Sequence, residues 1–269
     1  MRIYGGDSLA IARGRLPEDY PIVSPMIAAL LADRRQAMPF KNMCDLAGVD
    51  LQEVYDLMHG VAERELYFIS VGYGGIMINT LYFLALLAKE SGYKGTMFRR
   101  TGIYDPDTLD ITNLYRLYPD LSQVSCEGGR KVGVAYSMHD HSQGNPLGGV
   151  DVRACRFSKA DIPSQEGREA VIVGAPDFQT REDLVGTPFL FMGHAGNELQ
   201  IYKTPRVDTE LTRETYGSVD TTIFLYNVLL GTVELLRTLA CGADRTAADD
   251  TAIATINFAE MVNTKDEKC

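Results

Sequence analysis

The sequence lacks the features that are typical of nucleic-acid-binding and membrane-spanning proteins. Its 26 lysines and arginines are outnumbered by 36 aspartates and glutamates, for a net charge of -10, whereas sequence-independent nucleic-acid binding needs a positive surface. The longest apolar run, around residues 81–88, is too short to cross a bilayer. The N-terminus carries no apolar signal segment. We therefore expect no nucleic-acid partner, no membrane association and a cytoplasmic location.

Cysteine is sparse and irregularly placed. No two of the five cysteines are spaced as Cys-x-x-Cys, so neither a disulfide framework nor a zinc knuckle is indicated, and a reducing compartment is the default. His139 and His141 flank Asp140 and raise the alternative of a metal site. The more common reading of such a segment, which runs into Gly-Asn-Pro, is a polar surface loop.

The chain is long enough, at 269 residues, for one substantial α/β domain with a small appendage. Apolar residues recur at three- and four-residue spacing in 22–35 and 41–61, which predicts amphipathic helices and a small helical N-terminal region over residues 1–64. Residues 43–58 loosely resemble a helix-turn-helix. A recognition helix with so many acidic residues would meet phosphate with the wrong charge, so two packed helices are the preferred interpretation.

A strand, a glycine turn and a helix follow one another from residue 66. Residues 66–71 are a short apolar run rich in aromatic and β-branched types, which is typical of a buried parallel strand. Gly72, Gly74 and Gly75 then lead into a predicted helix over 78–90. Glycines let the backbone approach phosphates closely, and a helix N-terminus offers free N–H groups to an anion. The pattern predicts an α/β fold with a Rossmann-like, mainly parallel sheet and helices on both faces.

The next segment carries acidic and basic residues at a regular spacing. Asp105 is expected at the end of the second strand, where an acidic residue accepts hydrogen bonds from a ribose. Asn113 and Arg116 lie three residues apart, so in a helix they share one face and can both point at phosphates. A plain dinucleotide-binding loop has a third glycine where this chain has Met77.

These two motifs together resemble a known family. Gly-x-Gly-Gly at 72–75, followed by Asp-x-Asp-x-Leu-x-x-Thr-Asn-Leu-x-Arg at 105–116, is similar to the pattern of the ThiF/MoeB/HesA superfamily of adenylating enzymes, relatives of the ubiquitin-activating enzymes. The resemblance runs from about residue 67 to residue 239 and leaves the first 60 residues unexplained. It implies an ATP-binding adenylation domain over residues 65–245 and a C-terminal tail over residues 246–269.

The resemblance also implies roles for individual residues. Those implied to bind the nucleotide are Gly72, Gly74, Gly75, Asp105, Asp107, Asn113, Arg116 and Lys131. Arg116, Lys131 and Asp177 are implied to be catalytic, with Asp177 as the ligand of Mg²⁺. Three alternatives stay open: Asp105 ends a strand without binding a ligand, Arg130 competes with its neighbour Lys131, and Asp177 caps the helix that follows it.

The activity implied by the resemblance is ATP- and Mg²⁺-dependent activation of a carboxylate as its acyl-adenylate. A carboxylate is a poor nucleophile and the α-phosphate is anionic, so the reaction needs cations and fixed geometry. The implied partner is a small protein or peptide with a free C-terminal carboxylate, such as a ubiquitin-like or sulfur-carrier protein. A homodimer is also implied, in which Arg34 or Arg35 completes the partner's ATP site or is simply a solvated helix end.

Two observations limit the substrate and the chemistry. Residues 202–222 hold no cysteine, so no thioester step is expected, and Cys126 is read as a loop or core residue. Met77 in place of glycine supports one alternative, a catalytically silent subunit of the same fold that binds a partner. A second alternative is a nicotinamide-dependent oxidoreductase, although the Asn-Leu-x-Arg segment has no evident task there.

Overall fold

A seven-stranded sheet forms the centre of the protein, in the order β3-β2-β1-β4-β5-β6-β7. The computed structural model describes residues 40–108, 146–162, 170–174, 180, 182, 184, 190–195, 198–202, 221–242 and 252–261. The strands are β1 (Tyr67–Val71), β2 (Arg100–Tyr104), β3 (Gly149–Arg153), β4 (Ala170–Gly174), β5 (Leu190–Ala195), β6 (Glu198–Tyr202) and β7 (Ala252–Ile256). Strands β1 to β5 pair in parallel, whereas β6 pairs antiparallel with both β5 and β7. The predicted α/β fold with a mainly parallel sheet is confirmed.

The first strand and helix form where the local sequence predicts them. Strand β1 is buried over four of its five residues, as expected of a central strand. Helix α5 (Gly75–Ser91) follows it after a short glycine turn and starts three residues earlier than its apolar run predicts. It ends at Gly92, whose left-handed φ of 80° is a common way to terminate a helix.

The N-terminal part of the described chain is a pair of helices, α3 (Phe40–Ala47) and α4 (Leu51–Glu63). Asp50 caps α4, because its carboxylate accepts hydrogen bonds from the backbone N–H groups of Gln52 and Glu53. Buried residues of both helices belong to the same hydrophobic cluster as those of α5 and of helix α8 (Thr221–Cys241). Residues 40–63 therefore share one core with the sheet domain.

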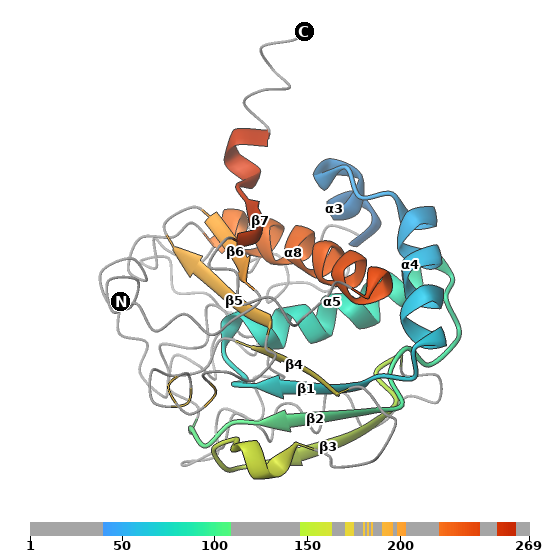
Figure 1. Cartoon of the computed structure of the whole chain (residues 1–269). Helices are drawn as coiled ribbons and strands as arrows, with labels where there is room; N and C mark the ends of the chain where they lie inside the picture. Colours follow the sequence, from blue (N-terminus) through green and yellow to red (C-terminus); the bar gives the residue numbers. More distant parts are fainter. Residues whose placement is uncertain are drawn as a thin grey trace, which may run out of the picture.

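Figure 1 shows α4, α5 and α8 together on one face of the sheet. Helix α8 packs against both α4 and α5, which also contact each other, and it packs on β6. Its residues Ile223–Cys241 are long and apolar enough to cross a membrane, but most of this segment is buried inside the protein. Such burial on three neighbouring elements is what the core helix of a folded domain shows.

The far end of the sheet is built from two later segments of the chain. Strands β5 and β6 pair antiparallel, with Ala195 opposite Glu198. Strand β7, which lies in the segment assigned above to a C-terminal tail, extends the sheet beyond β6. Asn227 of α8 fastens this segment, since its side-chain oxygen accepts the Phe258 backbone N–H at 2.8 Å and its amide nitrogen lies 3.2 Å from His194 Nε2.

An ion pair joins α4 to α8 across 184 residues of sequence. Arg237 donates from Nε and a terminal nitrogen to the two carboxylate oxygens of Glu53, at 2.7 and 2.9 Å. This hydrogen bonding lowers the pKa of Glu53 below its ordinary value of 4.5. Because the pKa of Glu53 is lower in the folded state, the ionised carboxylate stabilises the folded protein. This contribution is fully present above the unfolded-state pKa, and it is lost as the pH falls through the folded-state pKa.

We therefore expect Glu53→Gln to destabilise the protein at pH 7 by at most about 1 kcal/mol, because both side chains are partly exposed. The deficit relative to wild type should stay constant above about pH 5 and shrink below pH 4.5, where wild-type Glu53 also becomes protonated. Urea unfolding of both proteins between pH 3 and pH 8 measures this. A deficit that grows on acidification would contradict the assignment.

Candidate functional site

The sheet reverses its order of connection between β1 and β4. From β1 the chain proceeds to β2 and β3 on one side, and it then returns to β4 on the other side of β1. In open, mainly parallel sheets, ligands bind outside the carboxyl ends of the strands at such a switch point. The segments that leave the carboxyl ends of β1 and β2 are the glycine turn at 72–75 and Asp105, which the sequence singles out.

The first two glycines of the turn differ in their backbone conformation and surroundings. Gly72 has a φ of 83°, in the left-handed region that side chains disfavour, and its N–H donates to the Tyr104 carbonyl at 2.8 Å. Gly74 is the N-cap of α5 and has an extended backbone that any residue adopts. A Cβ built on Gly74 meets no atom within 4 Å among the described residues. Gly74 therefore has no described side chain or backbone against it at the start of α5, where backbone N–H groups lack intrahelical partners.

Asp105 connects this turn to the end of β2. Its side chain is 3% exposed, and one carboxylate oxygen accepts the Tyr73 backbone N–H at 2.6 Å while the other accepts the Asp107 backbone N–H at 2.8 Å. These two bonds fix the carboxylate between the glycine turn and the residues that follow β2. Asp107 itself is exposed. The structure thus brings Asp105 and Asp107 together with the glycine turn.

Tyr73 anchors the glycine turn in the hydrophobic core. Its ring is fully buried within the main hydrophobic cluster, and burial raises the pKa of its hydroxyl far above the ordinary value. With the ring fixed in the core and the N–H bound to Asp105, the turn is held from two sides. Sequence reasoning treated this position as a spacer between glycines and missed its anchoring role.

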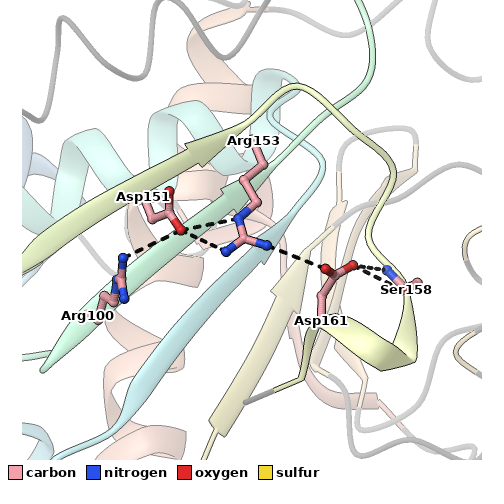
Figure 2. A network of polar contacts seen from close by, with 5 residues as sticks. All are labelled: Arg100, Asp151, Arg153, Ser158 and Asp161. Carbon is pink, nitrogen blue, oxygen red and sulfur yellow. Dashed lines mark hydrogen bonds and ion pairs between the residues drawn. The ribbon is translucent and has the colours of Figure 1, made fainter.

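An arginine beside Asp105 also escaped the sequence analysis. Arg153 ends β3, and its carbonyl accepts the Asp105 backbone N–H at 3.2 Å. Its guanidinium carbon lies 5.3 Å from the centre of the Tyr104 ring. Figure 2 shows it between the carboxylates of Asp151 and Asp161. No local motif marks Arg153, because its position depends on the pairing of β3 with β2.

Several predicted residues lie outside the described part of the chain. They are Arg34, Arg35, Asn113, Cys126, His139, His141, Arg116, Lys131 and Asp177. Their proposed roles stay predictions. Gly75 is described as the first residue of α5, directly after the open position of Gly74.

The described cysteines differ in their exposure to solvent. Cys44 is buried, and desolvation raises the pKa of its thiol to about 12, so it is an unreactive core residue. Cys155 and Cys241 are exposed and free. Within the described ranges, no group of three or more histidines, cysteines, aspartates or glutamates is arranged to hold a metal ion.

Comparisons with known proteins find similarity in structure only. No protein-family model matches the chain, and no curated protein matches it. A structure of E. coli MccB with ATP superposes with a TM-score of 0.44 at 13% identity, over 77% of this chain and 66% of MccB. MccB with MccA-N7isoASN gives the same TM-score and identity over 77% of this chain and 67% of MccB.

A second similar structure comes from another E. coli protein. The tRNA N6-threonylcarbamoyladenosine dehydratase TcdA superposes with a TM-score of 0.43 at 13% identity, over 78% of this chain and 98% of TcdA. At these TM-scores and identities the similarities carry no argument about function. The resemblance to the ThiF/MoeB/HesA superfamily continues to rest on the motifs.

Proposed function

We propose that the protein is an ATP- and Mg²⁺-dependent adenylyltransferase that activates a carboxylate as its acyl-adenylate. The observation that carries the proposal is the glycine turn at the N-terminus of α5, whose Tyr73 N–H is bound by the buried carboxylate of Asp105. A helix N-terminus suits a phosphate, and an acidic residue after the second strand suits a ribose. Both stand at the switch point of the sheet, so a nucleotide fits this place.

The glycine turn and Asp105 suit NAD as well as ATP, so the choice of ATP rests on the motif at 105–116. Asn113, Arg116 and Lys131 are proposed to surround the phosphates with hydrogen-bond donors and positive charge. Asp177 is proposed to hold Mg²⁺, which usually has few protein ligands and shares phosphate oxygens. Mg²⁺ supplies further positive charge next to the α-phosphate when it is bound.

The substrate in this proposal is the C-terminal carboxylate of a peptide or small protein. One carboxylate oxygen attacks the α-phosphorus of ATP, the bond from the α-phosphorus to the oxygen that bridges it to the β-phosphorus breaks, and pyrophosphate leaves with that oxygen. The protein contributes orientation and positive charge, and no protonation of the substrate is needed. In the same proposal the protein acts as a homodimer in the cytoplasm. The alternative, a catalytically silent subunit that binds a partner, would keep the fold but would release no pyrophosphate.

Gly74→Ala separates nucleotide binding from folding. The backbone of Gly74 is compatible with alanine and the added Cβ meets open space, so we expect a stability loss of only about 0.5–1 kcal/mol from the poorer N-cap. The same Cβ projects where a phosphate would approach α5. We expect the affinity for Mg-ATP to fall at least about tenfold, which corresponds to roughly 1.4 kcal/mol. Calorimetric titration and thermal unfolding measure the two effects.

Gly149→Ala is the matched control. A Cβ at Gly149 also meets open space, but Gly149 begins β3 at the amino end of the parallel strands, opposite the proposed site. It should bind Mg-ATP like the wild type. Titration with NAD completes the experiment, because tighter binding of NAD than of Mg-ATP would replace the adenylation proposal with the oxidoreductase alternative.

A further inference from the structure

Arg153 is the centre of a polar network at the edge of the sheet. Its Nε and one terminal nitrogen lie 3.2 and 3.1 Å from a single oxygen of Asp151, and its other terminal nitrogen lies 3.5 Å from Asp161. Asp161 in turn accepts hydrogen bonds from the backbone N–H and the hydroxyl of Ser158, at 2.9 and 3.0 Å. Figure 2 shows that the network joins β2, β3 and the short 3-10 helix Lys159–Asp161.

The position of the Arg153 guanidinium depends on the neighbouring strand β2. Tyr104 pairs with Arg153 across β2 and β3, and Gly102 pairs with Asp151. A Cβ on Gly102 would come within 3.1 Å of the Tyr104 ring. The absence of a side chain at Gly102 therefore leaves room for this ring to lie along the strand. The guanidinium then covers the ring, an arrangement that is favourable between a cation and an aromatic face.

The same residue is bound to the nucleotide site through the backbone. The Arg153 carbonyl accepts the Asp105 N–H, and the Asp105 carboxylate accepts the Tyr73 N–H. The Tyr104 carbonyl meanwhile accepts the Gly72 N–H. A continuous series of polar contacts therefore runs from Asp161 through Arg153 and Asp105 to the glycine turn.

We propose that Arg153, held by Asp161, is a positioning residue that keeps Asp105 and the glycine turn in the geometry needed for nucleotide binding. The inference rests on the function proposed above. The charge of Arg153 is balanced by two carboxylates, which suits a role in fixing the end of β3 better than a role as a ligand for phosphate. Its side chain is 47% exposed, so its removal should leave the fold intact.

The test is Arg153→Ala, read by amide exchange and by nucleotide titration. Loss of the guanidinium frees the end of β3, so the Tyr73 amide should exchange with solvent about threefold faster or more. The affinity for Mg-ATP should fall by about three- to tenfold, while the melting temperature changes little. Arg153→Lys keeps the charge but lacks the planar fork, and it should restore part of both losses.

Arg100→Ala is the matched control. Arg100 also pairs with Asp151, at 3.7 Å, but it begins β2 at the end of the sheet away from Asp105. Its removal should change neither the Tyr73 amide exchange nor the affinity for Mg-ATP. An equal loss in Arg100→Ala would overturn the proposal, since the effect would then belong to the edge of the sheet in general.

A double-mutant cycle with Asp161→Ala tests whether the two residues act as one tether. If they do, the double variant should lose no more affinity than the worse single variant. Additive losses, or unchanged Tyr73 exchange in Arg153→Ala, would refute the tether. The exchange measurement needs no nucleotide, so a wild-type protein that fails to bind Mg-ATP would refute the proposed function separately.

Discussion

Asp105→Ala should weaken binding of Mg-ATP by on the order of 100-fold and also destabilise the folded protein. The carboxylate accepts two backbone N–H groups in the structure, those of Tyr73 and Asp107. A hydrogen bond to a charged group contributes about 1.5–3 kcal/mol, so the loss of both should cost about 3–6 kcal/mol in the free energy of unfolding. The loss of affinity has the same origin, since a ribose held by this carboxylate would lose one or two such bonds.

The matched control for this prediction is Asp50→Ala. Asp50 also accepts two backbone N–H groups, from Gln52 and Glu53, but it does so at the start of α4. It should lower stability by about 0.5–2 kcal/mol as a lost helix cap and leave nucleotide affinity unchanged. Urea unfolding and calorimetric titration compare the two variants. An Asp105→Ala protein that binds Mg-ATP normally would limit Asp105 to a structural role.

Asp105→Asn refines the result. Asparagine keeps one carbonyl oxygen for one backbone N–H, but its amide group is a donor and faces the second N–H. We expect its stability to lie between those of the wild type and Asp105→Ala. Affinity should remain strongly reduced, because a neutral amide binds ribose hydroxyls less strongly than a carboxylate.

Gly174→Ala should destabilise the folded protein strongly, with a cost of about 3 kcal/mol. A Cβ on Gly174 would lie 2.0 Å from the Val71 carbonyl oxygen and 2.9 Å from its carbonyl carbon. Both atoms are backbone of β1, which pairs with β4 at this position, so no side-chain rotation relieves the clash. The strands must separate where the sheet changes its order of connection. We therefore also expect weaker binding of Mg-ATP.

Gly231→Ala provides the comparison within the same core. The added Cβ would lie 2.1 Å from a Leu199 methyl carbon, which is the end of a flexible side chain. Rotation of Leu199 and the better helix propensity of alanine in α8 should hold the cost to about 1 kcal/mol or less. Chemical unfolding of both variants ranks them. A Gly174→Ala protein as stable as Gly231→Ala would contradict the close approach of β1 and β4.

The sequence predicted the elements whose signals are local. The strand at 66–71, the glycine turn and the helix after it all lie within about 25 residues and carry strong composition signals. Strand β3 was not predicted, and β7 fell in the presumed tail. Both are five-residue strands whose place in the sheet depends on pairing, of β3 with β2 and of β7 with β6.

The candidate site shows the same division. The sequence by itself placed glycines after a strand and an aspartate after the next strand, because these positions are local and their chemistry is specific. Only the tertiary structure decided that the Asp105 carboxylate binds the Tyr73 N–H and that Arg153 lies beside it. Those contacts depend on the parallel register of β1, β2 and β3, which joins segments far apart in the sequence. The pairing of Glu53 with Arg237 is likewise beyond local sequence, since packing of α4 on α8 brings together residues 184 positions apart.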